Sequence, residues 1–287
     1  RYKGRSNALF MDRAIEFVLK TIAEQLNFSN DPQSVLVQNL ETYLPDIYHY
    51  SLLIMDIVVK PIAYSVLGFL LLLEFHQIAQ KIYSNYSAFG GFELFLPLFL
   101  KLGLSLLVMR NLTVFIHAIV GISTIINVGI GELGIQAEMD QVVDFSLIME
   151  QEQAMNFFEK LTLLLLLFIP LVLSLLTNIM TKIVVFLRFF ELYFYFSLSP
   201  IILVTFIHEE INQIGKNFFR MICAASLQGV LLFMVLSFYP LLVQTLFSIQ
   251  ERQGLITVIC IISGNCLTLC ISLFYTNKWA KAIMAVA

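Results

Sequence analysis

The stretch that decides the fold is residues 161–187, LTLLLLLFIPLVLSLLTNIMTKIVVFL, in which Lys182 is the only charged side chain. The hydrocarbon core of a bilayer is about 30 Å thick, so a helix that crosses it needs roughly 20 mainly apolar residues. Lipid offers no hydrogen bonds, and each backbone amide must therefore be satisfied inside the helix. This stretch is long enough to cross, and it predicts a membrane helix.

The same template finds further spans on both sides of this stretch. Residues 57–75 form the first span, and residues 94–130 follow as an apolar tract. As one helix this tract of 37 residues would be about 55 Å long, which is too long for one straight crossing. We expect a break at Arg110 and Asn111, followed by a helix that lies in the interface, re-enters or crosses back. The last two spans are predicted at residues 221–247 and 255–275.

The composition of the whole chain agrees with this reading. Of its 287 residues, 59% are hydrophobic and 13% are charged, whereas a soluble domain is about 45 to 50% apolar and about 25% charged. Disordered, collagen-like and disulfide-scaffold classes are excluded, because the apolar content is high and the chain has 13 Gly, 7 Pro and 4 Cys. The predicted fold class is an all-α polytopic membrane protein.

The N-terminal region has a different pattern. Within residues 6–26 one helical face carries only apolar side chains and the opposite face carries charges. The apolar face consists of Met11, Ile15, Val18, Ile22 and Leu26. A second short amphipathic helix, containing Leu36, Leu40, Tyr43 and Ile47, is expected to end near Pro45. We interpret residues 1–56 as amphipathic helices that pack on the membrane domain or on a neighbour.

The distribution of charge predicts the orientation. Residues 132–159 contain seven acidic side chains and no Lys or Arg. Basic residues in short loops mark the cytoplasmic side, so this segment is expected outside, with the N-terminus outside and the C-terminus inside. The basic residues expected inside are Lys81, Lys182, Arg188, Lys216, Arg220, Lys278 and Lys281.

This orientation requires that the aromatic segment 189–207 does not cross fully, because a full crossing would carry Lys216 and Arg220 outside. We therefore expect five crossings and one re-entrant or interfacial helix, with six crossings as the alternative. The organisation is then amphipathic helices at 1–56, two transmembrane helices at 57–131, an acidic extracytoplasmic loop at 132–159, a C-terminal bundle at 160–277 and a cytoplasmic tail at 278–287.

Ionisable side chains inside the spans are costly and are candidates for function. Glu74 and Lys101 lie near the facing ends of two consecutive spans and could form an ion pair that fixes the helix register. Alternatively, Lys101 extends to the interface and Glu74 lies at the headgroups. Arg188 and Glu191 are spaced i, i+3 and could neutralise each other, and Pro200 would bend the segment that follows.

Polar residues also form a stripe beyond the expected break. Thr113, His117, Thr124 and Asn127 fall close to one side of an otherwise apolar helix. Such a stripe must be buried, either in contacts between helices or subunits or along an aqueous lumen, and contacts are the commoner case. Gln228 lies beside a pair of small residues, which indicates close helix packing.

The sequence offers no case for an enzyme, a metal site or a cofactor. Residues 208–210, His-Glu-Glu, lack the HExxH spacing of a zinc site. Cys260, Cys266 and Cys270 lie in one apolar span without a CxxC motif, which favours small buried hydrophobes. No Walker loop and no GxSxG nucleophile motif occurs in the chain.

Several motifs resemble the TrbL family, the VirB-six-like polytopic membrane subunits of conjugative type IV secretion systems. The central motifs are RFFELY at residues 188–193, SPI at 199–201, GKNFFR at 215–220 and ASLQG at 225–229. Residues 60–64 (KPIAY), 70–74 (LLLLE) and 101–111 further resemble the forms found in Gram-positive bacteria, so the resemblance runs from about residue 60 to residue 275.

This resemblance implies a subunit of the cytoplasmic membrane with about five crossings that assembles as a ring-shaped homo-oligomer, a pentamer. It implies partners as well: membrane lipid, other machine subunits including cytoplasmic ATPases, and a transient single-stranded DNA and protein substrate. The leading hypothesis is a non-enzymatic scaffold or channel subunit. The alternative is a secondary transporter or small-solute channel, with Arg110, Asn111 and His117 as its candidate site.

Overall fold

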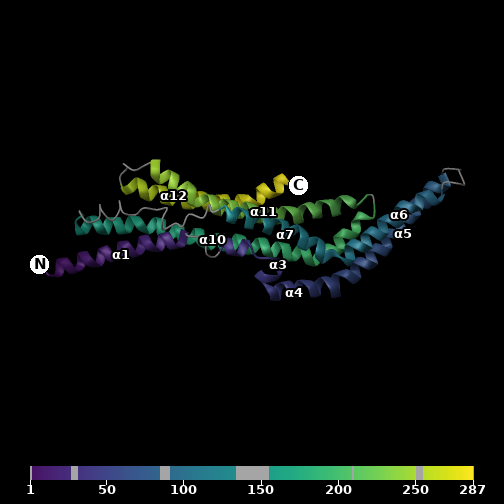
Figure 1. Ribbon diagram of the computed structural model, residues 1–287, viewed down its shortest axis with the longest axis horizontal. Coiled ribbons are helices and arrows are strands. Elements are labelled where there is room, and N and C mark those ends of the chain that lie inside the picture. The colour runs from purple at the N-terminus through teal and green to yellow at the C-terminus, as the bar shows by residue number, and fades with distance from the viewer. Residues whose placement is uncertain are drawn as a thin grey trace. The chain divides into compact units, whose positions relative to one another are not determined.

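The computed structural model describes residues 2–26, 32–84, 91–133, 155–208, 210–249 and 255–286. These residues are overwhelmingly helical, and no strand occurs among them (Figure 1). The predicted all-α class is confirmed. By contacts between Cα atoms the chain divides into two compact units, and each is described separately below.

Unit 1 comprises residues 1–37, 125–186 and 229–278. It holds α1 (Tyr2–Leu26), α2 (Pro32–Leu36), the end of α7 (Leu112–Glu132), the first part of α10 (Phe157–Leu203), the second part of α11 (Asn212–Ile249) and most of α12 (Leu255–Ile283). Helix α1 buries one apolar stripe, in which Ile15, Leu19 and Ile22 are fully inaccessible to solvent. The amphipathic helix expected here is therefore present, and its apolar face packs within the chain.

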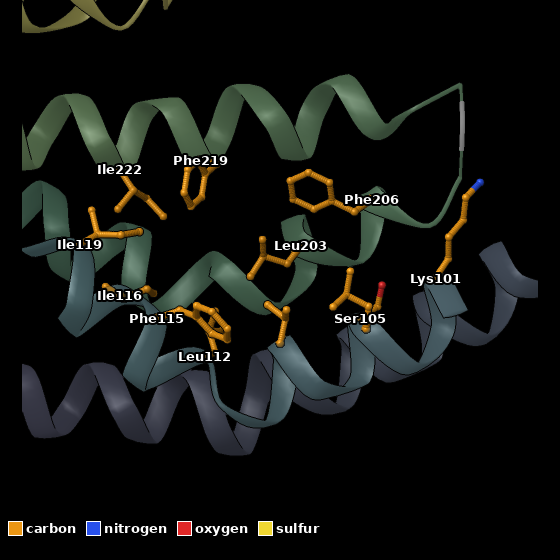
Figure 2. Close-up of a pocket in the computed structure, with 12 residues that line it drawn as sticks. Lys101, Ser105, Leu112, Phe115, Ile116, Ile119, Leu203, Phe206, Phe219 and Ile222 are labelled. Carbon is orange, nitrogen blue, oxygen red and sulfur yellow. The ribbon is translucent and has the colours of Figure 1, made fainter. Parts of the chain in front are cut away.

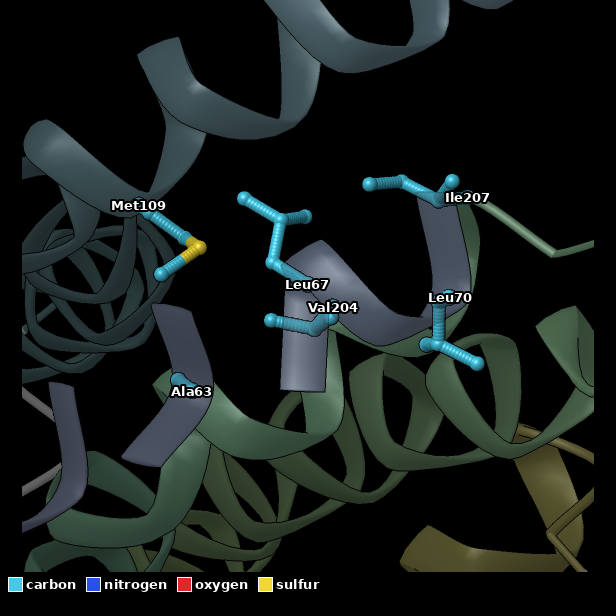
Figure 3. Close-up of a cluster of buried hydrophobic side chains, with 6 residues drawn as sticks. All are labelled: Ala63, Leu67, Leu70, Met109, Val204 and Ile207. Atoms are coloured by element: carbon cyan, nitrogen blue, oxygen red, sulfur yellow. The ribbon is translucent and has the colours of Figure 1, made fainter. Parts of the chain in front are cut away.

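Unit 2 comprises residues 38–124, 187–228 and 279–287. Its elements are α3 (Leu40–Tyr43), α4 (Pro45–Leu53), a six-residue π-helix η1 (Ile54–Val59), α5 (Lys60–Ser84), α6 (Gly91–Arg110) and the 3₁₀ turn η2 (Val204–Phe206), together with the remaining parts of α7, α10, α11 and α12. One buried cluster joins three of them. Ala63, Leu67 and Leu70 of α5 pack with Met109 of α6 and with Val204 and Ile207 at η2 (Figure 3).

Among the described residues, five helical segments are long and apolar enough to cross a membrane. They are Pro45–Gln80, Leu112–Glu132, Phe157–Phe206, Asn212–Val243 and Ile256–Ile283. The chain is thus a multi-pass membrane protein. One of these five segments differs from our expectation. In the tract at 94–130 the second helix, α7, is long and apolar enough to cross, whereas the first helix, α6, is not.

One expected boundary is wrong. The segment 189–207 is not a separate helix, since α10 continues from Phe157 to Leu203 as one helix of 47 residues, about 70 Å long. Residues 187–190 contain neither Gly nor Pro, and nothing local interrupts the helix there. A short helix does end near Pro45, since α3 ends at Tyr43. The residues expected to form that one helix are divided among α2, α3 and α4, and Pro45 begins α4 at its first position, where the missing N–H of proline costs no hydrogen bond.

The break expected at Arg110 and Asn111 is found. Helix α6 ends at Arg110, and α7 begins at Leu112. The side-chain Nδ2 of Asn111 donates to the carbonyl oxygen of Leu107 at 2.9 Å. Asparagine competes in this way with the backbone hydrogen bonds of a helix, which explains why the chain turns at this position. Most of the acidic loop at 132–159 lies outside the described residues.

Candidate functional site

Arg188 is the most deeply buried charged side chain of unit 2, with 2% of its surface exposed. Its Nε donates to the carbonyl oxygen of Ala225 on α11 at 3.3 Å, and its Nη2 donates to Oγ of Ser123 on α7 at 3.2 Å. The guanidinium also lies 5.0 Å from the ring centroid of Phe189. One side chain therefore links α7, α10 and α11. We call Arg188, Ser123 and Ala225 the arginine junction.

The pairing of Arg188 with Glu191, expected from their spacing, is not formed. Glu191 instead accepts a hydrogen bond of 2.5 Å from the hydroxyl of Tyr195, one turn further along α10. The guanidinium points to α7 and α11, where it satisfies a backbone carbonyl and a buried hydroxyl. Two neutral oxygens thus replace the carboxylate that the sequence pattern suggested.

Four buried polar atoms of unit 2 have no hydrogen-bond partner in the described part of the chain. They are Oε2 of Glu74, Nη1 of Arg188, Oγ of Ser226 and Oε1 of Gln228. Buried polar groups are normally paired, and an unpaired one is costly. Gln228 is buried on α11, and its role in close helix packing stays a prediction.

The aromatic part of α10 holds α3 and α4 in unit 2. The ring of Phe189 stacks on Tyr43 with centroids 4.3 Å apart, and Phe196 stacks on Tyr48 at 5.6 Å. The hydroxyl of Tyr193 donates to the carbonyl oxygen of Leu40 at 2.8 Å. The high aromatic content of this segment therefore serves helix packing. Pro200 is buried near the end of the segment, and α10 tightens into η2 after Leu203.

The structure brings Glu74 and Lys101 together. Lys101 Nζ lies 3.4 Å from Oε1 of Glu74, between α5 and α6. The Glu74 side chain is 7% exposed and the Lys101 side chain 35% exposed. The ion pair is therefore only partly buried, and the carboxylate of Glu74 is its more buried partner.

Two residues of the polar stripe of α7, His117 and Asn127, make contacts between helices. His117 Nε2 lies 2.9 Å from the hydroxyl of Tyr48 on α4 and 3.5 Å from Oε1 of Glu41 on α3. Thr113 is half-buried, and the hydroxyl of Thr124 donates to the carbonyl of Val120 within α7. In unit 1, Asn127 Nδ2 donates to the carbonyl oxygen of Leu36 on α2 at 2.9 Å.

The three residues named for a transporter site have unlike surroundings. His117 bonds to Tyr48, Asn111 bonds back to Leu107 of α6, and Arg110 is exposed at the end of α6. Among the described residues, no three His, Cys, Asp or Glu side chains come together as a metal site. Glu209, in the His-Glu-Glu sequence, lies outside the described residues.

Unit 2 contains an apolar cavity of about 380 Å³ (Figure 2). Side chains of α6, α7, η2 and α11 line it, and Lys101 and Ser105 supply its polar groups. Figure 2 shows Phe206 and Phe219 on one side of the cavity and Phe115 and Leu112 on the other. Such a lining accommodates hydrocarbon and offers no constellation for catalysis.

A comparison with protein families gives the decisive observation. Residues 33–200 match the family model described as "TrbL/VirB6 plasmid conjugal transfer like protein". The chain belongs to this TrbL/VirB6 family. Family membership implies a component of conjugal transfer. The match covers more than half of the chain and includes Glu74, Lys101, His117 and Arg188.

The matched region ends at Pro200, so the motifs at residues 215–220 and 225–229 lie outside it. The TrbL/VirB6 match does not separate Gram-positive from other forms, and that subtype stays a prediction. No curated protein and no solved structure matches the chain.

Sequence reasoning missed several residues of the arginine junction and of the stripe contacts. Ser123, Glu41 and Tyr48 were not singled out, although each bonds to a predicted site residue. Their partners lie between 65 and 76 residues away along the chain, and helical spacing gives no information at that separation. The clustering of Tyr and Glu just before the first span was the one available signal.

Proposed function

We propose that this chain is a non-enzymatic scaffold or channel subunit of a conjugative type IV secretion machine. It would help pass single-stranded DNA and protein across the cytoplasmic membrane. The family match over residues 33–200 carries this proposal. Five apolar helical segments support it, since they suit a multi-pass subunit embedded in the membrane.

In the proposed machine, copies of this chain form a closed ring, and cytoplasmic ATPases from other chains supply the energy. The N-terminus lies outside and the C-terminus inside. The distribution of charge supports this orientation, because basic residues are absent from the acidic segment 132–159 and recur in the segments assigned to the cytoplasm. Homo-oligomers usually close with cyclic symmetry, which a ring satisfies.

The arginine junction offers a residue with which to test this proposal. Arg188 lies in the matched region and bonds to two other long helices, so it controls how α7, α10 and α11 meet. A subunit in a ring must present a fixed surface to its neighbours. We therefore assign to Arg188 the role of holding the helices that form this surface.

The experiment is a transfer assay in a donor strain that lacks the gene, complemented with Arg188→Glu. A carboxylate would face the Ala225 carbonyl and lose both hydrogen bonds, so transfer should fall at least about tenfold and ring yield should fall with it. The matched control is Arg220→Glu, because Arg220 is exposed on α11 and its reversal should leave transfer near the wild-type level.

The outcomes separate the role from simple misfolding. Normal transfer and normal ring yield with Arg188→Glu would refute the role assigned to Arg188. Loss of the protein from the membrane would indicate a folding defect. In that case the variant Arg188→Met tests the role assigned to Arg188. This variant removes the charge but keeps the volume, and the account expects it to reach the membrane and to form rings at reduced yield.

A further inference from the structure

Helix α1 lies beside the first part of α10 in unit 1 (Figure 1). Lys160 Nζ donates to Oδ1 of Asp12, and Asn178 Nδ2 donates to the carbonyl oxygen of Gln25 at 2.9 Å. Gln25 follows Asp12 along α1, and its partner Asn178 follows Lys160 along α10. The two helices therefore run parallel between these two contacts.

The part of α10 between these contacts is the part best suited to lipid. Residues 161–177 carry no charged side chain. From Lys160 to Asn178 the helix rises about 27 Å, close to the roughly 30 Å of the bilayer core. Outward side chains on this stretch are apolar, and Leu165 is 67% exposed. This stretch therefore spans the hydrocarbon.

The outward face of α1 carries four charged side chains together with one apolar side chain, Phe17, which is 70% exposed. Arg13, Glu16, Lys20 and Glu24 are all exposed, and all lie between the contacts at Asp12 and Gln25. We call these four residues the charged face of α1. The contacts place this face at the depth of the hydrocarbon, where charged side chains are strongly disfavoured unless they meet water or a partner. Arg13 and Glu24 lie next to the two contacts, at the edges of this depth, whereas Glu16 and Lys20 lie about 6 to 8 Å further in along the helix.

We infer that the charged face of α1 lines a water-filled space inside the membrane that copies of this chain enclose. Two positive and two negative charges alternate along it, so the face is strongly hydrated but has no net charge with which to hold nucleic-acid phosphates. It suits the passage of a hydrated substrate without tight binding. The inference rests on the proposed ring, and it moves this part of residues 1–56 from the extracytoplasmic side to membrane depth.

The test is thiol labelling of the full chain in intact membranes, with peptide mass spectrometry to read each position separately from the native cysteines. Glu16→Cys and Lys20→Cys probe the charged face. Leu165→Cys and Val172→Cys are the controls at matched depth on the outward side of α10, where both native residues are exposed. The probes are a charged, membrane-impermeant methanethiosulfonate and a bilayer-soluble maleimide.

The charged reagent should modify the two α1 positions at least about tenfold faster than the two α10 positions, because it enters water but not hydrocarbon and reacts with the thiolate. Reaction of α1 positions with the maleimide alone would show a lipid-facing helix and overturn the inference. Protection from both reagents would show that a protein surface covers the face, which also overturns it.

Equal, fast labelling of all four positions by the charged reagent would overturn the placement of α10 in the bilayer, and the inference with it. None of these results depends on DNA transfer. Failure of the proposed function would appear instead in the transfer assay with the wild-type chain, so the two failures are distinguishable.

Discussion

Arg188 and Lys101 are both basic side chains within unit 2, and the chain stabilises them in different ways. Lys101 meets the carboxylate of Glu74 on the preceding helix and keeps 35% of its side chain exposed. Arg188 is 2% exposed, and it donates to the neutral oxygens of Ser123 and Ala225 and lies over the ring of Phe189. The first site joins neighbours in the sequence, and the second joins three helices that are far apart along the chain.

This difference teaches which charge the fold depends on. A partly exposed ion pair is screened by its surroundings and contributes little free energy. A buried guanidinium without a carboxylate keeps its charge only because fixed dipoles compensate it, and removing it leaves those dipoles unpaired. We therefore expect large effects at the arginine junction and small effects at the Glu74 and Lys101 pair.

The largest effect is expected for Arg188→Ala. The substitution removes two charge-assisted hydrogen bonds and leaves the Ala225 carbonyl and the Ser123 hydroxyl without this donor. We expect the free energy of unfolding to fall by about 2 to 3 kcal/mol. Unfolding in mixed micelles of increasing denaturing detergent measures it. A loss below about 0.5 kcal/mol would show that Arg188 contributes no more than a surface charge, and it would contradict the difference described between Arg188 and Lys101.

A smaller effect is expected where α11 begins. A Cβ on Gly215 would lie 2.7 Å from Cε2 of Phe206, so Gly215→Ala must displace the ring and shift the start of the helix that carries Ala225. We expect a loss of about 1 to 2 kcal/mol in the same unfolding assay. The matched control is Gly264→Ala on α12, where a Cβ meets nothing within 4 Å. Its stability should stay the same or rise, and equal losses for both would contradict the packing described at Gly215.

The smallest effect is expected at the ion pair. In a double-mutant cycle with Glu74→Gln and Lys101→Met, the coupling free energy should be below about 1 kcal/mol, because exposure of Lys101 screens the pair. The cycle is measured in the same micelles. A coupling above about 2 kcal/mol would show that the pair behaves as a buried one and would break the comparison with Arg188.

The sequence predicted the elements whose causes are local. The apolar runs predicted the helices, the 3.6-residue pattern predicted the buried face of α1, and Asn111 predicted the break between α6 and α7. Glu74 and Lys101 could be proposed as partners because consecutive antiparallel helices bring them near each other. In each case the spacing along one or two neighbouring helices contains the information.

The errors arise where distant residues decide. Arg188 was expected to end a span and to pair with Glu191, yet Ser123 and Ala225 accept its hydrogen bonds and allow α10 to continue. The bonds that attach α1 and α2, made by Asn178 and Asn127, join residues about 90 to 150 positions apart and have no local signature. The new helix that begins at Pro45 does have a local signature, since proline favours the first turn of a helix.

The most direct test of the central claim is the mass of the wild-type protein in native lipid particles, by native mass spectrometry. The account predicts a closed ring of about five copies of the protein plus bound lipid. A monomer or dimer that binds a small solute would contradict the secretion scaffold and would favour a transporter instead.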